Sequence, residues 1–328
     1  MNPLISVVMS VLNREKYVPA AIQSVLDQSY TNFEFIIIDD GSTDRTLEVI
    51  RQFTDPRIRV MVNEKNLGIS RSSNLGVKIA QGRYIARMDS DDVCLPRRFE
   101  KQVEFLRLHP EVGVLGTEVN ELIGNGKAIT RSRNILTDPY SIKFWLLTDS
   151  VIYNPTAMIN KEILLQVNGY DPAFNYSEDY ELWTRLAKIT QITVLPDPLL
   201  NYRIHPESVS VEKSEEQKQL HIAIARREIS SLTGIDFAVE VLDAIYSTEP
   251  ISPKLARQAV HLFNSCLRNF EKQNQATAVQ RKQLRDRVNW RNFRILKRVQ
   301  PQYSVLDDLI KIYFKNHDIL VSNLRGKI

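Results

Sequence analysis

Short apolar runs alternate with amphipathic segments over the first 90 residues of the chain. Apolar, β-branched runs, one of them alternating with polar residues, predict strands at 5–11, 33–38, 58–62 and 83–88. Apolar side chains at helical spacing predict a helix at 18–26, another carrying Leu47, Ile50 and Phe53, and a third after the polar turn at 63–68. Ser42 or Thr43 is placed to cap the second helix, and Gly82 to end the third. The order β-α-β-α-β-α-β predicts an α/β fold with a doubly wound, mostly parallel sheet.

The rest of the chain divides into a mixed region and a helical one. We expect helices at 96–108 and at 177–186. Between them, residues 112–150 should form strands with a turn at 124–126, followed by a helical piece near Trp145. From about residue 212 the chain is rich in Lys, Arg, Glu, Gln and Leu and has almost no glycine, which favours helices. The sequence therefore predicts a sheet domain at 1–211 and a helical C-terminal appendage at 212–328.

Two acidic clusters lie where predicted strands end, and they are Asp39-Asp40-Gly41-Ser42 and Asp89-Ser90-Asp91-Asp92. In doubly wound sheets ligands bind at the carboxyl ends of the strands, so both clusters predict a binding edge. Carboxylates this close repel one another, and a divalent cation such as Mg²⁺ or Mn²⁺ relieves the repulsion. A metal at a strand end suits a substrate that carries phosphates.

Each cluster also has a structural explanation. Asp40 is placed to accept a hydrogen bond from the N3–H of a uracil or thymine ring, but Asp, Gly and Ser also suit a strand-to-helix turn. Asp89 and Asp91 are separated by one residue, so in an extended segment they point the same way. Their place at a strand end favours a shared metal over an acidic loop.

Further candidates follow downstream. Asp179 lies in the first turn of the helix predicted at 177–186, where a carboxylate acts as a general base or only complements the helix dipole. Trp183 on the same helix faces either a sugar or the core. Arg203 and His205 are suited to stabilising a leaving diphosphate, and His205 alternatively holds the metal or is structural.

A loop-to-helix segment upstream adds weaker candidates. Asn66, Gly68 and Arg71 lie where the ribose or a phosphate of a nucleotide would fit.

Composition limits the compartment and the partners. The chain has 328 residues and a net charge of +4, but residues 213–328 carry 20 Lys and Arg against 12 Asp and Glu, whereas 1–212 carry 23 against 27. Cys94 and Cys266 are far apart, which favours a reducing compartment. No signal peptide or membrane-spanning helix is expected, so we expect a cytoplasmic protein. The basic stretch 281–291 suits an anionic membrane surface, or equally a helix or dimer partner.

Taken together, the motifs resemble the family-2 glycosyltransferases, which are inverting enzymes with the GT-A fold. The resemblance covers about residues 3–210. Its carriers are Ser6-Val7-Val8-Met9-Ser10-Val11-Leu12-Asn13, Asp39-Asp40-Gly41-Ser42, Asn66-Leu67-Gly68, Gly82 to Asp92, Gly169-Tyr170-Asp171, Glu178 to Trp183, and Tyr202-Arg203-Ile204-His205. Singly these motifs are weak, but in this order and spacing they are specific.

The resemblance implies a role for each position. Residues 1–211 would be the GT-A catalytic domain, and Asp40 would bind the base of the donor nucleotide with Asp39 close by. Asp89 and Asp91 would form the DxD motif that holds Mn²⁺ or Mg²⁺, with Asp91 the direct ligand, and Asp179 would be the catalytic base. Further donor contacts would come from Ser10, Leu12, Asn66, Gly68, Arg71 and Arg203. Some relatives place an aromatic ring at Leu12, so stacking on the base is weaker here.

The implied reaction moves a sugar from a nucleotide-diphosphate sugar, a UDP-sugar first, to a hydroxyl of a glycan or lipid-linked acceptor. The expected setting is bacterial surface polysaccharide synthesis, peripheral at the inner face of the membrane, without nucleic acid and with homo-oligomers left open. A nucleotidylyltransferase would need a glycine-rich loop where Asn13-Arg14-Glu15-Lys16 stands, and a dinucleotide dehydrogenase would need G-x-G-x-x-G. A catalytically silent sugar-binding module is the remaining alternative.

Overall fold

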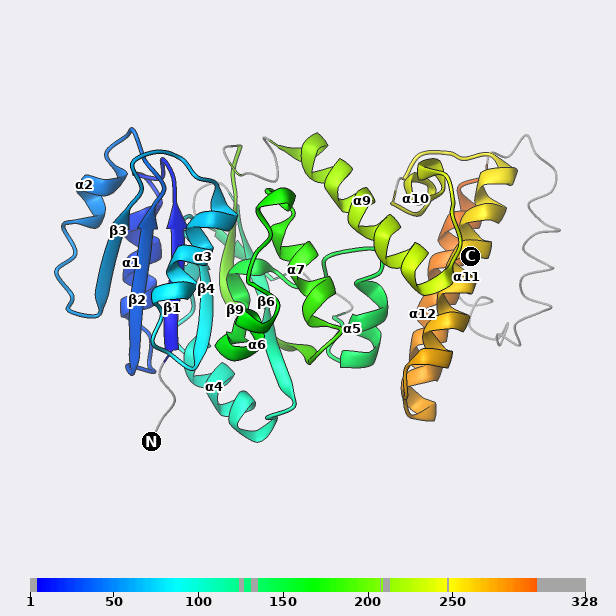
Figure 1. Ribbon diagram of the computed structural model, residues 1–328, viewed down its shortest axis with the longest axis horizontal. Helices are drawn as coiled ribbons and strands as arrows, with labels where there is room; N and C mark the ends of the chain where they lie inside the picture. The colour runs from blue at the N-terminus through cyan, green and yellow to red at the C-terminus, as the bar shows by residue number, and fades with distance from the viewer. Residues whose placement is uncertain are drawn as a thin grey trace. The chain divides into compact units, whose positions relative to one another are not determined.

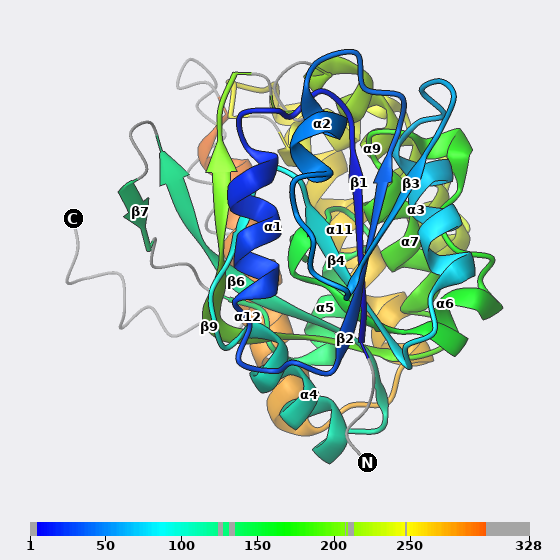
Figure 2. The ribbon, with the colours of Figure 1, turned by 90° about the vertical axis from the view of Figure 1, so that its left-hand side faces the viewer.

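The computed structural model describes residues 5–123, 127–130, 135–206, 208, 213–246 and 248–299. Four parallel strands form one half of its sheet, in the order β3-β2-β1-β4 (Figures 1 and 2). They are β1 (Ile5–Val11), β2 (Phe33–Asp39), β3 (Ile58–Val62) and β4 (Tyr84–Asp89). These are the four strands predicted from the sequence. β1 lies between β2 and β4, and almost all of its residues are buried, on both faces of the sheet.

The other half of the sheet is mixed. Past β4 the order continues β8-β6-β9-β5, with β7 paired to β6. The strands are β5 (Val93–Cys94), β6 (Val112–Ile123), β7 (Lys127–Ile129), β8 (Met158–Asn160) and β9 (Gln191–Ile204). β8 pairs antiparallel with both β4 and β6, whereas β6 and β9 pair in parallel. The sheet is therefore doubly wound and only mostly parallel, as expected for the GT-A fold.

Helices cover both faces of this sheet, and Figure 2 shows α1 and α3 on opposite sides of the strands. Alternate residues of β1 separate the two cores: Ile5, Val7 and Met9 pack in one and Val8 in the other. The first core receives α1 (Val18–Leu26), α2 (Thr46–Ile50) and α4 (Arg98–Leu108). The second receives α3 (Ile69–Ile79), α5 (Pro139–Trp145), α6 (Lys161–Gln166) and α7 (Glu178–Leu186).

Two predicted helix ends are wrong. Neither Ser42 nor Thr43 caps α2, because the helix begins after Arg45 and the Asp44 carboxylate accepts the Thr46 N–H. α3 ends at Ile79, before Gly82, because Ala80 is already extended. The Gly82 N–H instead donates to Ser6 Oγ at 2.8 Å. The predicted turn at 124–126 lies outside the described residues.

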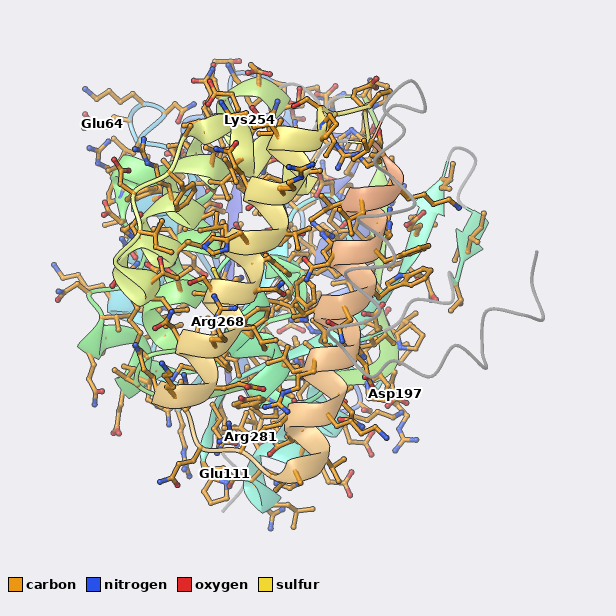
Figure 3. All side chains as sticks on the ribbon, turned by 90° about the vertical axis from the view of Figure 1, so that its right-hand side faces the viewer. Glu64, Glu111, Asp197, Lys254, Arg268 and Arg281 are labelled. Carbon is orange, nitrogen blue, oxygen red and sulfur yellow. The ribbon has the colours of Figure 1, made fainter. Side chains whose placement is uncertain are left out.

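The chain divides into two compact units, residues 1–225 and 226–328. The division lies within α9 (Ser214–Thr233), beyond the boundary expected at 211–212, which stays a prediction. The described part of the second unit contains α10 (Val239–Tyr246), α11 (Pro253–Gln273) and α12 (Ala278–Lys297). α11 and α12 pair as a hairpin, and Lys254 and Arg281, near their starts, lie at opposite ends of the pair (Figure 3).

No helix among the described residues is long and apolar enough to span a bilayer. Both cysteines are buried free thiols, Cys94 on β5 and Cys266 on α11.

Candidate active site

A cleft of about 1240 Å³ opens at the carboxyl ends of β1, β2 and β4, entirely within the first unit. This is the edge at which the acidic clusters were expected. Nine of the predicted site residues line the cleft: Ser10, Leu12, Asp40, Asn66, Gly68, Asp89, Asp91, Asp179 and Arg203. Asp39 and His205 are buried beside it, whereas Arg71 is exposed and does not line it.

The turn after β4 is tied to the end of β9 through Asp91. Its Oδ2 lies 3.0 Å from Nε2 of His205 and 3.7 Å from Nε of Arg14. Arg203 secures the same turn, since its Nε donates to the backbone oxygen of Asp91 at 2.7 Å and its N–H to Asp92 Oδ1 at 2.8 Å. Arg14 and the end of β9, far apart in sequence, thus hold the Asp91 carboxylate in the lining of the cleft.

Tyr17, just before α1, packs against Arg203 on β9 and against His205, the residue after that strand. Its ring centroid lies 4.6 Å from that of His205 and 5.1 Å from the guanidinium carbon of Arg203. The ring therefore limits the rotation of both side chains.

Asp89 faces a buried cation. Nη2 of Arg87, whose side chain is 1% exposed, lies 3.4 Å from Asp89 Oδ1, and Nη1 donates to the backbone oxygen of Val8 at 3.2 Å. Burial raises the pKa of Asp89 to about 6, because the attraction of Arg87 does not fully offset the lost hydration. An added cation near this carboxylate would favour its ionised form.

Asp40 organises the loop between β3 and α3. Its Oδ1 accepts from Asn63 Nδ2 at 2.8 Å and from the Leu67 N–H at 2.9 Å, and its Oδ2 accepts from the Gly68 N–H at 2.9 Å. Gly68 has φ +89°, a conformation that favours glycine. Asp40 thereby fixes the shape of the loop as well as lining the cleft.

In Asp39, the residue before Asp40, only one carboxylate oxygen has a hydrogen bond within the described residues. Asp39 Oδ1 accepts from the Ser42 N–H at 2.8 Å. Its Oδ2 is buried and has no hydrogen bond within the described residues. A buried acceptor without a partner costs free energy unless a ligand supplies the donor.

Asp179 lies in the first turn of α7, as predicted. Its Oδ1 accepts from the N–H of Tyr180, and burial raises its pKa to about 6. The adjoining Glu178 is 6% exposed, and burial together with the charge of Asp179 raises its pKa to about 8. Near neutral pH, Asp179 is therefore ionised and able to accept a proton, whereas Glu178 carries one.

The carboxylates and the imidazole at this edge are groups suited to a divalent cation. No cluster of three or more His, Cys, Asp or Glu side chains converges as a metal site in the part of the chain that the structure describes. Asp91 Oδ2 and His205 Nε2 nevertheless face each other at 3.0 Å, and Asp89 lines the same cleft. Mg²⁺ at phosphate sites is commonly held by one or two carboxylates, with the substrate phosphates and water completing the shell.

Several contributors were missed by sequence reasoning. Arg14 and Tyr17 belong to no recognisable motif, and Arg87 is indistinguishable from its neighbour Arg83 in the sequence. α9 also reaches the cleft through Gln217 and His221, and Lys213 lines it just before the helix, although this segment was assigned to the appendage. Conversely, Trp183 is fully buried in the core and cannot face a sugar.

Comparison with known proteins agrees with this arrangement. The model of the family described as "Glycosyl transferase family 2" matches residues 6–167. An uncharacterized glycosyltransferase of Haemophilus influenzae is 30% identical over 74% of this chain and 79% of its own length. The O-antigen biosynthesis glycosyltransferase WbnJ of Escherichia coli is 35% identical over 62% of this chain and 81% of its own.

Among solved structures, S. aureus TarS 1–349 in complex with UDP-GlcNAc superposes with a TM-score of 0.58 at 19% identity. The match covers 95% of this chain and 88% of TarS 1–349. At this identity the likeness shows the fold, which includes the mixed sheet and extends into the helical C-terminal region.

Proposed function

Because this chain belongs to glycosyl transferase family 2, we propose that it is a metal-dependent inverting enzyme that transfers a sugar from a nucleotide-diphosphate sugar to an acceptor hydroxyl. The observation that carries the proposal is that one cleft holds both acidic groups the reaction needs. Asp89 lines it at the end of β4, Asp91 lines it from the turn that follows, and Asp179 lines it from α7.

Asp179 acts as the general base. The acceptor oxygen forms a bond to the anomeric carbon while the bond from that carbon to the diphosphate oxygen breaks on the opposite side, so the configuration inverts. The hydroxyl proton passes to the Asp179 carboxylate, which its pKa of about 6 leaves ionised at neutral pH. Asp89, Asp91 and His205 would hold Mn²⁺ or Mg²⁺, which would neutralise the charge that develops on the diphosphate.

A UDP-sugar is the preferred donor. The Asp40 carboxylate lines the cleft and offers an acceptor for the N3–H of a uracil ring, and Asp39 is buried directly beside it. The fold neighbour TarS is described in complex with UDP-GlcNAc. Ser10, Leu12, Asn66 and Gly68 line the donor side of the cleft.

The acceptor is a growing glycan or a lipid-linked sugar of a bacterial surface polysaccharide. The support is the relative WbnJ, an O-antigen biosynthesis glycosyltransferase. A lipid-linked acceptor would bring the cytoplasmic enzyme to the inner face of the membrane, where the basic stretch 281–291 meets anionic lipid.

A thermal-shift panel of UDP, dTDP, GDP and CDP, each with Mn²⁺ or EDTA, tests this proposal. Ligand binding to the native state raises Tm by mass action. We expect the largest rise with UDP and a smaller one after EDTA. A rise with UDP but no release of UDP from any UDP-sugar would instead identify a silent binding module.

A further inference from the structure

Tyr176 has an unusual backbone conformation next to the general base. Its φ is +77°, whereas the other non-glycine residues with positive φ among those described are both asparagines. Asparagine tolerates this region, but a bulky aromatic residue there is a genuine outlier. Such strain persists only where surrounding contacts enforce it, and it is common at ligand sites.

α9 and Lys213, the residue just before it, supply the contacts that hold Tyr176. Gln217 Nε2 donates to the backbone oxygen of Tyr176 at 2.8 Å, and Ser177 Oγ donates to the backbone oxygen of Gln217 at 3.3 Å. Nζ of Lys213 lies 5.7 Å from the centroid of the Tyr176 ring. The two residues that precede α7 are therefore clamped by a helix that lies outside the matched family region at 6–167.

These residues share the cleft with Asp179. Tyr176, Lys213, Gln217 and His221 all line it, and the His221 ring lies 4.9 Å from that of Tyr180. Asn175 also lines the cleft and lies against Gly68, since a Cβ added at Gly68 would lie 3.1 Å from Oδ1 of Asn175. The segment before α7 therefore lies between the loop held by Asp40 and the first turns of α9.

We propose, on the basis of the function proposed above, that Tyr176, Lys213 and His221 form the subsite for a pyranose ring of the acceptor. Tyr176 offers an aromatic face on which the C–H face of a pyranose packs. Lys213 and His221 form hydrogen bonds with the hydroxyls of the sugar. Gln217 is a positioning residue, because it holds the backbone that presents this ring three residues before Asp179.

The polar groups present suit hydroxyls. Burial lowers the pKa of His221, so its imidazole is neutral at pH 7 and both donates and accepts. Lys213 contributes only donors and lies 3.6 Å from Glu216, so its charge is partly compensated. A neutral sugar ring therefore fits the subsite without a further anionic group.

Saturation-transfer NMR tests the subsite with methyl β-D-glucopyranoside, methyl β-D-galactopyranoside and their 2-acetamido counterparts, in the presence of UDP and Mg²⁺. Diamagnetic Mg²⁺ replaces Mn²⁺ in this experiment, because paramagnetic Mn²⁺ would broaden the signals of a bound sugar. We expect transfer to the ring C–H protons of at least one glycoside. In Tyr176→Ala the signal should fall about fivefold or more, whereas Tyr176→Phe should retain it because the aromatic face remains.

Gln217→Ala should also weaken the transfer, because it frees the Tyr176 backbone. Gln219→Ala is the matched control, since it removes the same side chain two positions along α9 at an exposed position outside the cleft. Equal signals for wild type and Tyr176→Ala would overturn the assignment, as would equal losses in the two glutamine variants.

The UDP thermal shift of the wild type separates this subsite from the function on which it rests. A UDP shift without transfer to any of the four glycosides refutes the pyranose subsite and leaves the proposed function standing. The absence of both signals counts against the proposed function and the subsite together.

Discussion

His205 Nε2 and Asp91 Oδ2 lie 3.0 Å apart, joining the end of β9 to the turn after β4. The two residues are 114 positions apart in the chain, and the contact depends on the parallel pairing of β9 with β6 and on the bridge from Arg203 to Asp92. We propose that both side chains hold the divalent ion of the reaction, because an imidazole nitrogen and a carboxylate oxygen are ordinary ligands of divalent metals.

Replacing His205 should therefore weaken metal binding more than folding. We expect His205→Ala to lower the affinity for Mn²⁺, measured by calorimetry with UDP present, by about 10- to 100-fold. His109→Ala is the control, because His109 is exposed and lies outside the cleft. An unchanged Mn²⁺ affinity in His205→Ala would remove His205 from the metal site.

We expect Asp179 to set the acid limb of the pH–rate profile. Its pKa of about 6 means that the base is protonated below that pH, so kcat should fall about tenfold per pH unit at more acidic pH. The rate of UDP release at saturating donor, followed from pH 4.5 to 8, measures this limb. A rate that stays flat down to pH 4.5 contradicts a base with this pKa.

Glu178 should lower stability at alkaline pH. Its folded pKa of about 8 exceeds the ordinary value of 4.5, so the folded state holds the proton more tightly and loses stability as pH rises from 4.5 towards 8. Glu178→Gln stays neutral, so it lacks this loss. Between pH 6 and pH 9 the free energy of unfolding of the variant should therefore rise relative to that of the wild type by at least about 1 kcal/mol. Urea unfolding at the two pH values measures the gain, and an equal loss in both proteins would show that Glu178 is already ionised.

The strain at Tyr176 predicts an order of stability between two truncations. Both Tyr176→Ala and Tyr176→Gly remove the ring, but only glycine accepts φ +77° without a steric penalty. Tyr176→Gly should therefore be the more stable by about 1 kcal/mol. Urea unfolding of the pair measures it, and a more stable alanine variant would mean that the segment relaxes to negative φ.

Local patterns predicted the first half of the sheet well. β1, β2 and β4 are apolar, buried runs, and β3 shows its alternation in sequence although it is partly exposed. The acidic clusters begin at the last residues of β2 and β4, so their place at the sheet edge follows from topology alone. Trp183 shows the limit of the same reasoning. Its position on α7 does not reveal which face meets the core, and the structure buries it completely.

Contacts between distant segments could not be predicted. β8 has only three residues, too few for a periodic pattern, yet it reverses the direction of the sheet. Arg87 and Arg83 look alike in sequence, and only the fold shows that Arg87 is buried beside Asp89. The role of α9 depends on Gln217, a residue with no chemical signature of its own.

The most direct test of the account is the turnover of Asp179→Asn at neutral pH with a UDP-sugar and acceptor, measured beside its UDP-induced rise in Tm. The substitution keeps the shape of the side chain and removes the proton acceptor. The account predicts a rise in Tm like that of the wild type and transfer slower by about 100-fold or more. Near-normal transfer by a folded, UDP-binding Asp179→Asn would show that the base lies elsewhere.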